Sequence, residues 1–86
     1  MPRRDRIDII ENILQLLLKR KGLKPTHLMY KANLSHNQMK NYLKELEEKK
    51  FINKEESKIK ITKPGEKFLE KIKEMKEFEI VFGLKK

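Results

Sequence analysis

Residues 33–46 (NLSHNQMKNYLKEL) concentrate side chains that both donate and accept hydrogen bonds. The chain has seven Asn and Gln residues, and four of them lie here: Asn33, Asn37, Gln38 and Asn41. Asn is a poor choice for an ordinary exposed helix position, because its amide competes with the backbone for hydrogen bonds. A side-chain amide can, however, bind N6 and N7 of adenine together. The segment therefore predicts hydrogen bonding to nucleic-acid bases.

The apolar residues of this segment have helical spacing. They predict a helix over residues 35–48, capped by Ser35, with an inward stripe of Leu34, Met39, Leu43 and Leu46. The outward face would then carry His36, Asn37, Lys40, Asn41 and Lys44, with Gln38 at its margin. The alternative is a face that is merely solvated. Phosphate contact is expected in the first two turns, because the end of the helix carries the repelling charges of Glu45, Glu47 and Glu48.

The charge of the chain supports an anionic partner. Its 86 residues, which predict one domain over residues 1–86, carry a net charge of +9. Residues 1–44 hold ten Lys and Arg against three Asp and Glu, a surplus of +7. Residues 45–86 hold twelve against ten, a surplus of +2. The basic surplus thus lies in the half that contains the amide-rich helix, which favours a nucleic acid as partner.

Several classes of function are not supported. The chain has no cysteine, which excludes disulfides and Cys-based zinc sites. His27 and His36 fall on different predicted helices without a carboxylate cluster, so no metal is expected. The sequence contains no nucleophile with a base and no phosphate-binding glycine loop, so we predict neither an enzyme nor a cofactor. Without a signal-peptide pattern or a membrane span, the expected location is cytoplasmic and nucleoid-associated.

The elements that must position these side chains follow from periodicity and turn residues. A first helix is expected over residues 5–20 and is stopped by Gly22. A second begins at residues 25–26 with Thr26 as its N-cap, and Asn33 ends it in the left-handed conformation. The turn of residues 33–35 gives helix–turn–helix spacing. The prediction is an α+β fold, mostly α: a winged helix–turn–helix with three helices, a two-stranded wing and a C-terminal helix.

The wing and the last helix follow the amide-rich helix. Residues 51–52 and 58–61 flank a polar run over 53–57, and the second segment alternates Lys and Ile. This alternation is typical of a half-buried strand, so a hairpin with charged residues near its tip is expected. Thr62 and Pro64 then begin a C-terminal helix over residues 63–80.

The run of residues 26–35 (THLMYKANLS) resembles archaeal winged-helix DNA-binding proteins, and the residues that follow it agree in order and spacing: Tyr42, Leu43, Leu46, Phe51, Ile52, Ile61, Thr62, Gly65, Phe68 and Leu69. This family includes small basic chromatin-associated proteins and transcription regulators, and a looser resemblance extends to MarR-like regulators. The resemblance implies dimerisation through the C-terminal helix. Such proteins tend to place Gly just before the first wing strand, where this chain has Lys50. The connection at Lys50 is therefore expected to differ slightly.

The second helix and the wing add candidate contacts to DNA. Thr26, His27, Tyr30 and Lys31 are predicted to bind backbone phosphates, with a half-buried Tyr30 as the alternative. Wing lysines at 54, 58 and 60 would reach phosphate or the minor groove, or else protect a strand edge. Arg3, Arg4 and Arg6 would form a minor-groove arm or a terminus without a specific role. The full predicted DNA-binding set is Thr26, His27, Tyr30, Lys31, Ser35, His36, Asn37, Gln38, Lys40, Asn41, Lys44, Lys54, Lys58 and Lys60.

The apolar surplus of the first and last helices predicts a homodimer. The first helix has an apolar face that is too wide for one contact, and residues 78–84 are unusually apolar for a chain end. Packing of the two against each other within a monomer is the alternative. The predicted dimerisation residues are Ile9, Ile13, Leu16, Phe68, Ile72, Met75, Phe78 and Phe82.

These observations predict a sequence-preferring protein that binds double-stranded DNA, a transcription regulator whose helix 35–48 enters the major groove. Its wing, residues 51–61, would contact the backbone or the minor groove. Two alternatives remain open at this point. One is an architectural chromatin protein without sequence preference. The other is a winged helix that binds another protein in a transcription or replication assembly.

Overall fold

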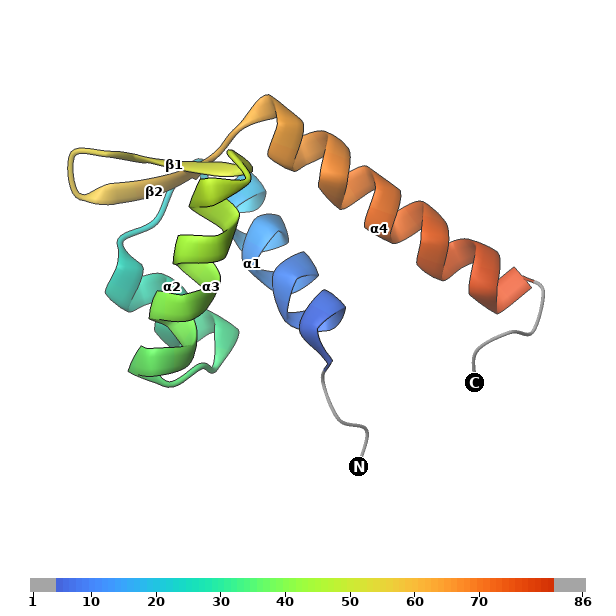
Figure 1. The fold of residues 1–86 in the computed structure, drawn as a ribbon, viewed down its shortest axis with the longest axis horizontal. Coiled ribbons are helices and arrows are strands. Elements are labelled where there is room, and N and C mark those ends of the chain that lie inside the picture. The colour runs from blue at the N-terminus through green and yellow to red at the C-terminus, as the bar shows by residue number, and fades with distance from the viewer. Residues whose placement is uncertain (1–4, 82–86) are drawn as a thin grey trace.

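The computed structural model describes residues 5–81, with side chains described through residue 78. The elements run in the order α1 (Arg6–Arg20), α2 (Pro25–Ala32), α3 (His36–Glu48), β1 (Ile52–Glu55), β2 (Lys58–Ile61) and α4 (Lys63–Val81). Figure 1 shows α1, α2 and α3 gathered beside the hairpin, with α4 extending away on the opposite side. This order and arrangement confirm the predicted winged helix–turn–helix fold.

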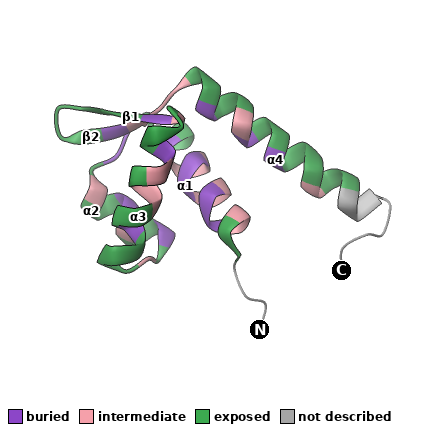
Figure 2. Cartoon of the chain, viewed as in Figure 1, coloured by how far each residue is buried: buried purple, intermediate pink, exposed green. Residues whose placement is uncertain are grey.

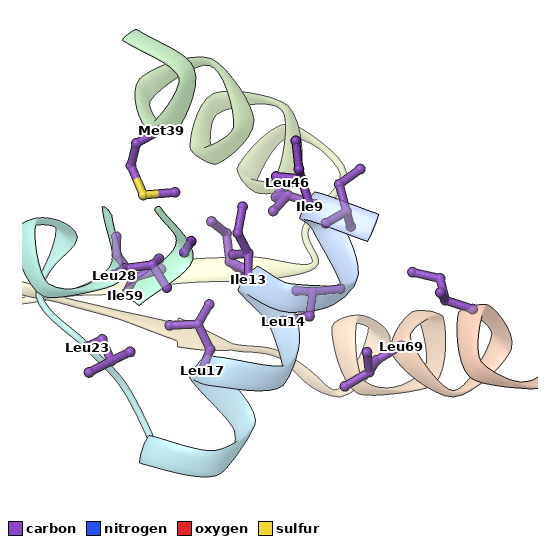
Figure 3. Close-up of a cluster of buried hydrophobic side chains, with 14 residues drawn as sticks. Ile9, Ile13, Leu14, Leu17, Leu23, Leu28, Met39, Leu46, Ile59 and Leu69 are labelled. Carbon is purple, nitrogen blue, oxygen red and sulfur yellow. The ribbon is translucent and has the colours of Figure 1, made fainter. Parts of the chain in front are cut away.

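The hydrophobic core is built around α1. Five of its residues are buried, and Ile13, Leu14 and Leu17 have no exposed surface. They meet buried residues from all the other elements, as Figure 3 shows for Leu28, Leu46, Ile59 and Leu69. Every buried side chain of the described residues is apolar. The wide apolar face of α1 is therefore used within the chain, because the helix packs on α2, α4 and β2 at once.

Both ends of α1 are fixed by local hydrogen bonds. Asp5 caps the N-terminus, and its side chain and that of Asp8 bond each other's backbone N–H. At the other end the left-handed residue is Lys21 (φ 55°), and Gly22 (φ 111°) follows it. The prediction that Gly22 stops the helix was thus one residue too late. Leu23 then exchanges backbone hydrogen bonds of 3.0 and 2.7 Å with Ile59, which joins this turn to the wing.

In the helix–turn–helix, one predicted residue role was wrong. The N-cap of α2 is Lys24, not Thr26, because Pro25 occupies the first helical position, where its missing N–H costs nothing. The other two local predictions are confirmed. Asn33 ends α2 in the left-handed conformation (φ 58°), and Ser35 caps α3.

The wing has longer strands and a shorter tip than the sequence indicated. The strands pair antiparallel from Ile52 opposite Ile61 to Glu55 opposite Lys58. Residues 53–55, expected in the polar connection, belong to β1, and the tip is reduced to Glu56 and Ser57. Phe51 lies just before the strand, and its ring stacks on Phe68 of α4 with centroids 4.5 Å apart. The wing is thereby tied to α4.

The connection from α3 to the wing passes through a strained residue. Lys50 has φ 64°, in the left-handed region. We expected the connection to differ from that of the similar proteins, which tend to have Gly here, and this expectation was wrong. Two contacts hold this residue: the N–H of Lys50 donates to the carbonyl of Glu47 (3.0 Å), and the hydroxyl of Thr62 donates to the carbonyl of Lys50 (2.7 Å). Tertiary contacts thus override the backbone preference of a lysine.

We expect Lys50→Gly to stabilise the protein by about 0.5–1 kcal/mol, because relief of left-handed strain exceeds the entropy that glycine adds to the unfolded chain. The measurement is the free energy of unfolding from urea titration. Lys49→Gly is the matched control, since Lys49 has φ −84° and is under no such strain. Equal effects of the two substitutions would contradict the strain at Lys50.

The first part of α4 packs on α1, and an ion pair closes the contact. Leu69 and Ile72 are buried in the core. One turn further, the ammonium of Lys76 binds the carboxylates of Asp8 and Glu11, the latter at 2.5 Å. These hydrogen bonds, chiefly the one that Lys76 donates to Asp8, raise the pKa of Lys76 above its usual range. By contrast, Met75 and Phe78 are 45% and 55% exposed. Two large apolar side chains are thus about half exposed on the distal half of α4.

Candidate nucleic-acid interface

The outward face of α3 carries the predicted base-contacting residues. Met39 and Leu46 anchor the helix in the core, and Tyr42 and Leu43 are half-buried. This leaves the opposite face to solvent, as the exposed stretch of α3 in Figure 2 shows. The exposed residues of its first two turns are His36, Asn37, Gln38, Lys40 and Asn41, with Lys44 directly after them. These turns carry no acidic residue, so nothing on them opposes a polyanion.

The beginning of α3 is held by a reciprocal cap. The hydroxyl of Ser35 accepts from the N–H of Gln38 (3.2 Å), and Oε1 of Gln38 accepts from the N–H of Ser35 (2.9 Å). This arrangement fixes the first turn of the helix. It also occupies the carbonyl oxygen that Gln38 would need to bind adenine through both amide atoms. The structure therefore gives Ser35 and Gln38 a role in capping, and leaves Asn37 and Asn41 as the available amides.

The predicted phosphate-binding residues of α2 all reach solvent. Thr26, His27, Tyr30 and Lys31 are exposed. Tyr30 is 76% exposed, so the half-buried alternative is wrong for this side chain. Its ring and hydroxyl are both free to approach a ligand.

A groove brings α2, α3 and the wing to one surface. It has a volume of about 310 Å³ and is lined by Thr26 of α2, His36 and Lys40 of α3, and Lys54 of β1 over Met29, Met39 and Leu43. Residues predicted separately on three elements thus lie together. The other wing lysines differ from each other. Lys58 is exposed, whereas Lys60 is half-buried and forms an ion pair with Glu55 at 3.0 Å.

Arg6 is part of α1 and not of a flexible arm. Its guanidinium donates to the carboxylate of Glu45 at 2.5 Å and lies 5.8 Å from the centre of the Tyr42 ring. The hydrogen bond to Glu45, with its charge, raises the pKa of Arg6. Arg3 and Arg4 lie outside the described residues. The sequence reasoning missed this contact, since the partners are 39 positions apart and only their opposite charges hint at it.

The predicted dimerisation residues divide into three groups. Ile9, Ile13 and Ile72 are buried in the core of the chain itself, so they cannot contact a partner without opening it, and Figure 3 shows Ile9 and Ile13 facing the core. Leu16 and Phe68 are half-buried. Met75 and Phe78 are exposed. Phe82 lies outside the described residues.

Within residues 5–81, no group of three or more His, Asp or Glu side chains is placed to hold a metal ion. None of the described helices combines the length and apolar character needed to cross a membrane.

Comparison with known proteins identifies a family and an archaeal relative. A family model described as a winged helix-turn-helix matches residues 3–80. An uncharacterized protein of Methanocaldococcus jannaschii is 42% identical over 73 residues, which are 85% of this chain and 34% of that protein. The chain thus spans about a third of the length of this archaeal relative.

Proposed function

This chain belongs to the winged helix-turn-helix family, and from that premise we propose that it binds double-stranded DNA with sequence preference, as a transcription regulator. In this proposal α3 enters the major groove, and the wing contacts the backbone or the minor groove. The supporting observation is the exposed face of α3, where Asn37, Lys40 and Asn41 lie in two turns that carry no acidic residue, with Lys44 directly after them. A DNA-binding role would place the protein in the cytoplasm, on the nucleoid.

The two amides are assigned base readout. Among the described residues, neither the Asn37 nor the Asn41 side chain makes a hydrogen bond, and both are exposed. Each amide can therefore offer its N–H and its carbonyl oxygen to adenine together. They lie four positions apart, which places them on one face of α3 about 6 Å from each other. That separation corresponds to about two base-pair steps of 3.4 Å each.

Phosphate contacts are assigned to the cations around the groove. Lys40 and Lys54 approach it from α3 and from the wing, and Thr26 and His36 complete its rim. Tyr30 and Lys31 of α2 and Lys58 of β2 are exposed as well, and we assign them to the same role. Contacts of this kind set the position and register of a protein on the duplex without specifying sequence.

We further propose that residues 1–86 form one domain that pairs with a second copy through the distal half of α4. Leu69 and Ile72 are covered by α1, but the same helix continues with exposed Met75 and Phe78. Two exposed large apolar residues one turn apart favour burial in an interface. A two-fold dimer would present two α3 helices to half-sites about 34–36 Å apart on a near-palindrome.

Architectural binding with little sequence preference is the second candidate. The observation that favours it is the charge, because a surplus of +9 on 86 residues binds any duplex through counterion release. The exposed amides of α3 favour the regulator, since non-specific phosphate binding has no use for them.

The double substitution Lys40→Gln with Lys44→Gln tests whether this face of α3 contacts DNA. We expect about tenfold weaker binding near physiological salt, and a slope of log K against log salt that is smaller by about 1.8, since each lost phosphate contact removes about 0.9. The measurement is fluorescence anisotropy with labelled duplex at several salt concentrations.

The matched control is Lys67→Gln with Lys73→Gln, which removes two exposed lysines of α4. It should leave the salt slope close to that of the wild type. If both double variants lose affinity and slope equally, net charge and not the α3 face determines binding, and the proposed interface is wrong.

A further inference from the structure

The edge of α3 that faces α1 carries a second polar depression. It has a volume of about 220 Å³ and is lined by Arg6, Gln38, Asn41, Tyr42 and Glu45. Four of these residues belong to α3 and Arg6 comes from the first turn of α1. The depression thus joins the N-terminus of α1 to the amide-bearing face of α3. It shares no lining residue with the groove that Lys40 and Lys54 line.

We propose that Arg6 is an additional DNA contact, which binds a backbone phosphate beside the bases that Asn41 faces, with Glu45 and Tyr42 as the residues that position it. This inference rests on the proposed DNA-binding function. It assigns a role to a residue of α1, outside the helix–turn–helix and the wing.

The position of Arg6 follows from helix geometry. Gln38, Asn41 and Glu45 are spaced by three and four residues, so they form one row along α3. The guanidinium is fixed at the Glu45 end of this row by a hydrogen bond of 2.5 Å, about one helical turn from Asn41. A duplex that contacts Asn41 would bring its backbone close to this guanidinium.

The chemistry of the guanidinium suits this task. It carries five N–H donors in a planar fork, and within the described part of the chain a single hydrogen bond, to Glu45, engages it. The Arg6 side chain is 62% exposed, whereas that of Glu45 is 30% exposed. The Arg6 guanidinium is therefore the more solvent-exposed member of this ion pair. The Tyr42 ring, 5.8 Å from the guanidinium carbon, supports it from below in a cation–π contact.

The same pair changes the electrostatics at the end of α3. The sequence suggested that Glu45 would repel phosphate, but its charge is matched by Arg6. The surface accessible to DNA thus extends past the second turn of α3 along this edge. Glu47 and Glu48 are exposed, and neither forms an ion pair within the described part of the chain, so the extension is confined to the side of α1.

The test must separate a phosphate contact from simple masking of Glu45, because Arg6→Gln would weaken binding in either case. Anisotropy titrations at several salt concentrations should therefore compare Glu45→Gln with the double variant Arg6→Gln, Glu45→Gln. In this background Arg6 no longer has the Glu45 carboxylate whose charge it could mask. If Arg6 binds phosphate, the double variant should bind about tenfold more weakly than Glu45→Gln, with a salt slope smaller by about 0.9.

Lys19→Gln serves as the control for loss of one charge. Lys19 is exposed on the last turn of the same helix, about 20 Å along the axis from Arg6. If the two Glu45→Gln proteins differ no more than Lys19→Gln differs from the wild type, the inference is overturned while DNA binding stands. If the wild type binds no duplex, the proposed function falls and this inference falls with it.

Discussion

Gly65→Ala is expected to destabilise the protein by about 2–3 kcal/mol, through overpacking that the surroundings cannot relieve. A Cβ at this position would lie 2.1 Å from the carbonyl oxygen of Phe51 and 2.9 Å from Cγ1 of Ile61. The oxygen cannot move aside freely, because it accepts a hydrogen bond of 3.0 Å from the N–H of Thr62. Thr62 in turn binds Lys50 and Gly65 through its hydroxyl. The substitution thus affects the whole junction of α3, the wing and α4.

The sign of this effect makes it diagnostic. In an ordinary helix interior, replacing Gly with Ala stabilises by about 0.8–1 kcal/mol. Glu66→Ala, at the next and exposed position of α4, is the control and should change the free energy of unfolding by about 0.5 kcal/mol or less. Urea titration measures both. A stabilising Gly65→Ala would mean that α4 does not approach the wing as closely as described.

The double substitution Asn37→Ala with Asn41→Ala is expected to abolish most sequence discrimination, at a cost of about 2 kcal/mol or more in the difference between selected and random DNA. The reason is that each amide supplies a donor and an acceptor to one base, whereas alanine supplies neither. Binding to random duplex should change little, since the phosphate contacts remain. The measurement is the ratio of the two dissociation constants at a fixed salt concentration.

Loss of folding does not provide a competing explanation for that result. Both residues are exposed on α3, and alanine is the better helix former at such positions. Asn53→Ala, which removes an exposed amide from the wing strand β1, is the matched control and should leave the ratio unchanged. If the double variant keeps its preference for the selected sequence, the readout lies elsewhere on the molecule.

The regular elements could be predicted from the sequence because their signals are local. The apolar spacing in α3, with Ser35 ahead of it, identifies both the buried stripe and the cap within fourteen residues. The Lys–Ile alternation does the same for β2. The errors were local as well. Thr26 is a good N-cap by type, but Pro25 fixes the helix start one position earlier.

The predicted dimer residues show what periodicity leaves open. The apolar breadth of α1 was assigned to a second copy of the chain, yet Ile9 and Ile13 pack against other parts of the same chain. Periodicity identifies the residues that must be buried, but it does not identify the part of this chain or the second chain that buries them. In this fold α1 is the central helix, with neighbours on several sides. Among the described residues, Met75 and Phe78 of α4 are more exposed than any apolar side chain of α1, where Leu18 alone of the large apolar residues is exposed.

Contacts between distant parts of the chain could not be predicted from the sequence. The pairing of Arg6 with Glu45, and of Lys76 with Asp8 and Glu11, depends on how α1 packs against α3 and α4. Charges at these positions resemble the many others of this Lys- and Glu-rich chain. The left-handed Lys50 is a similar case, because the hydroxyl that secures its carbonyl comes from Thr62, twelve positions later.

The most direct test of base readout by α3 is the affinity of the wild-type protein for DNA selected from a randomised pool, compared with random duplex. We predict a near-palindromic selected sequence that binds two chains, with a preference of about a thousandfold or more over random DNA. Fluorescence anisotropy at several salt concentrations gives both affinities. Equal affinity for the two duplexes, falling steeply with salt, would contradict base readout and establish architectural binding; no binding to either would exclude DNA as the partner.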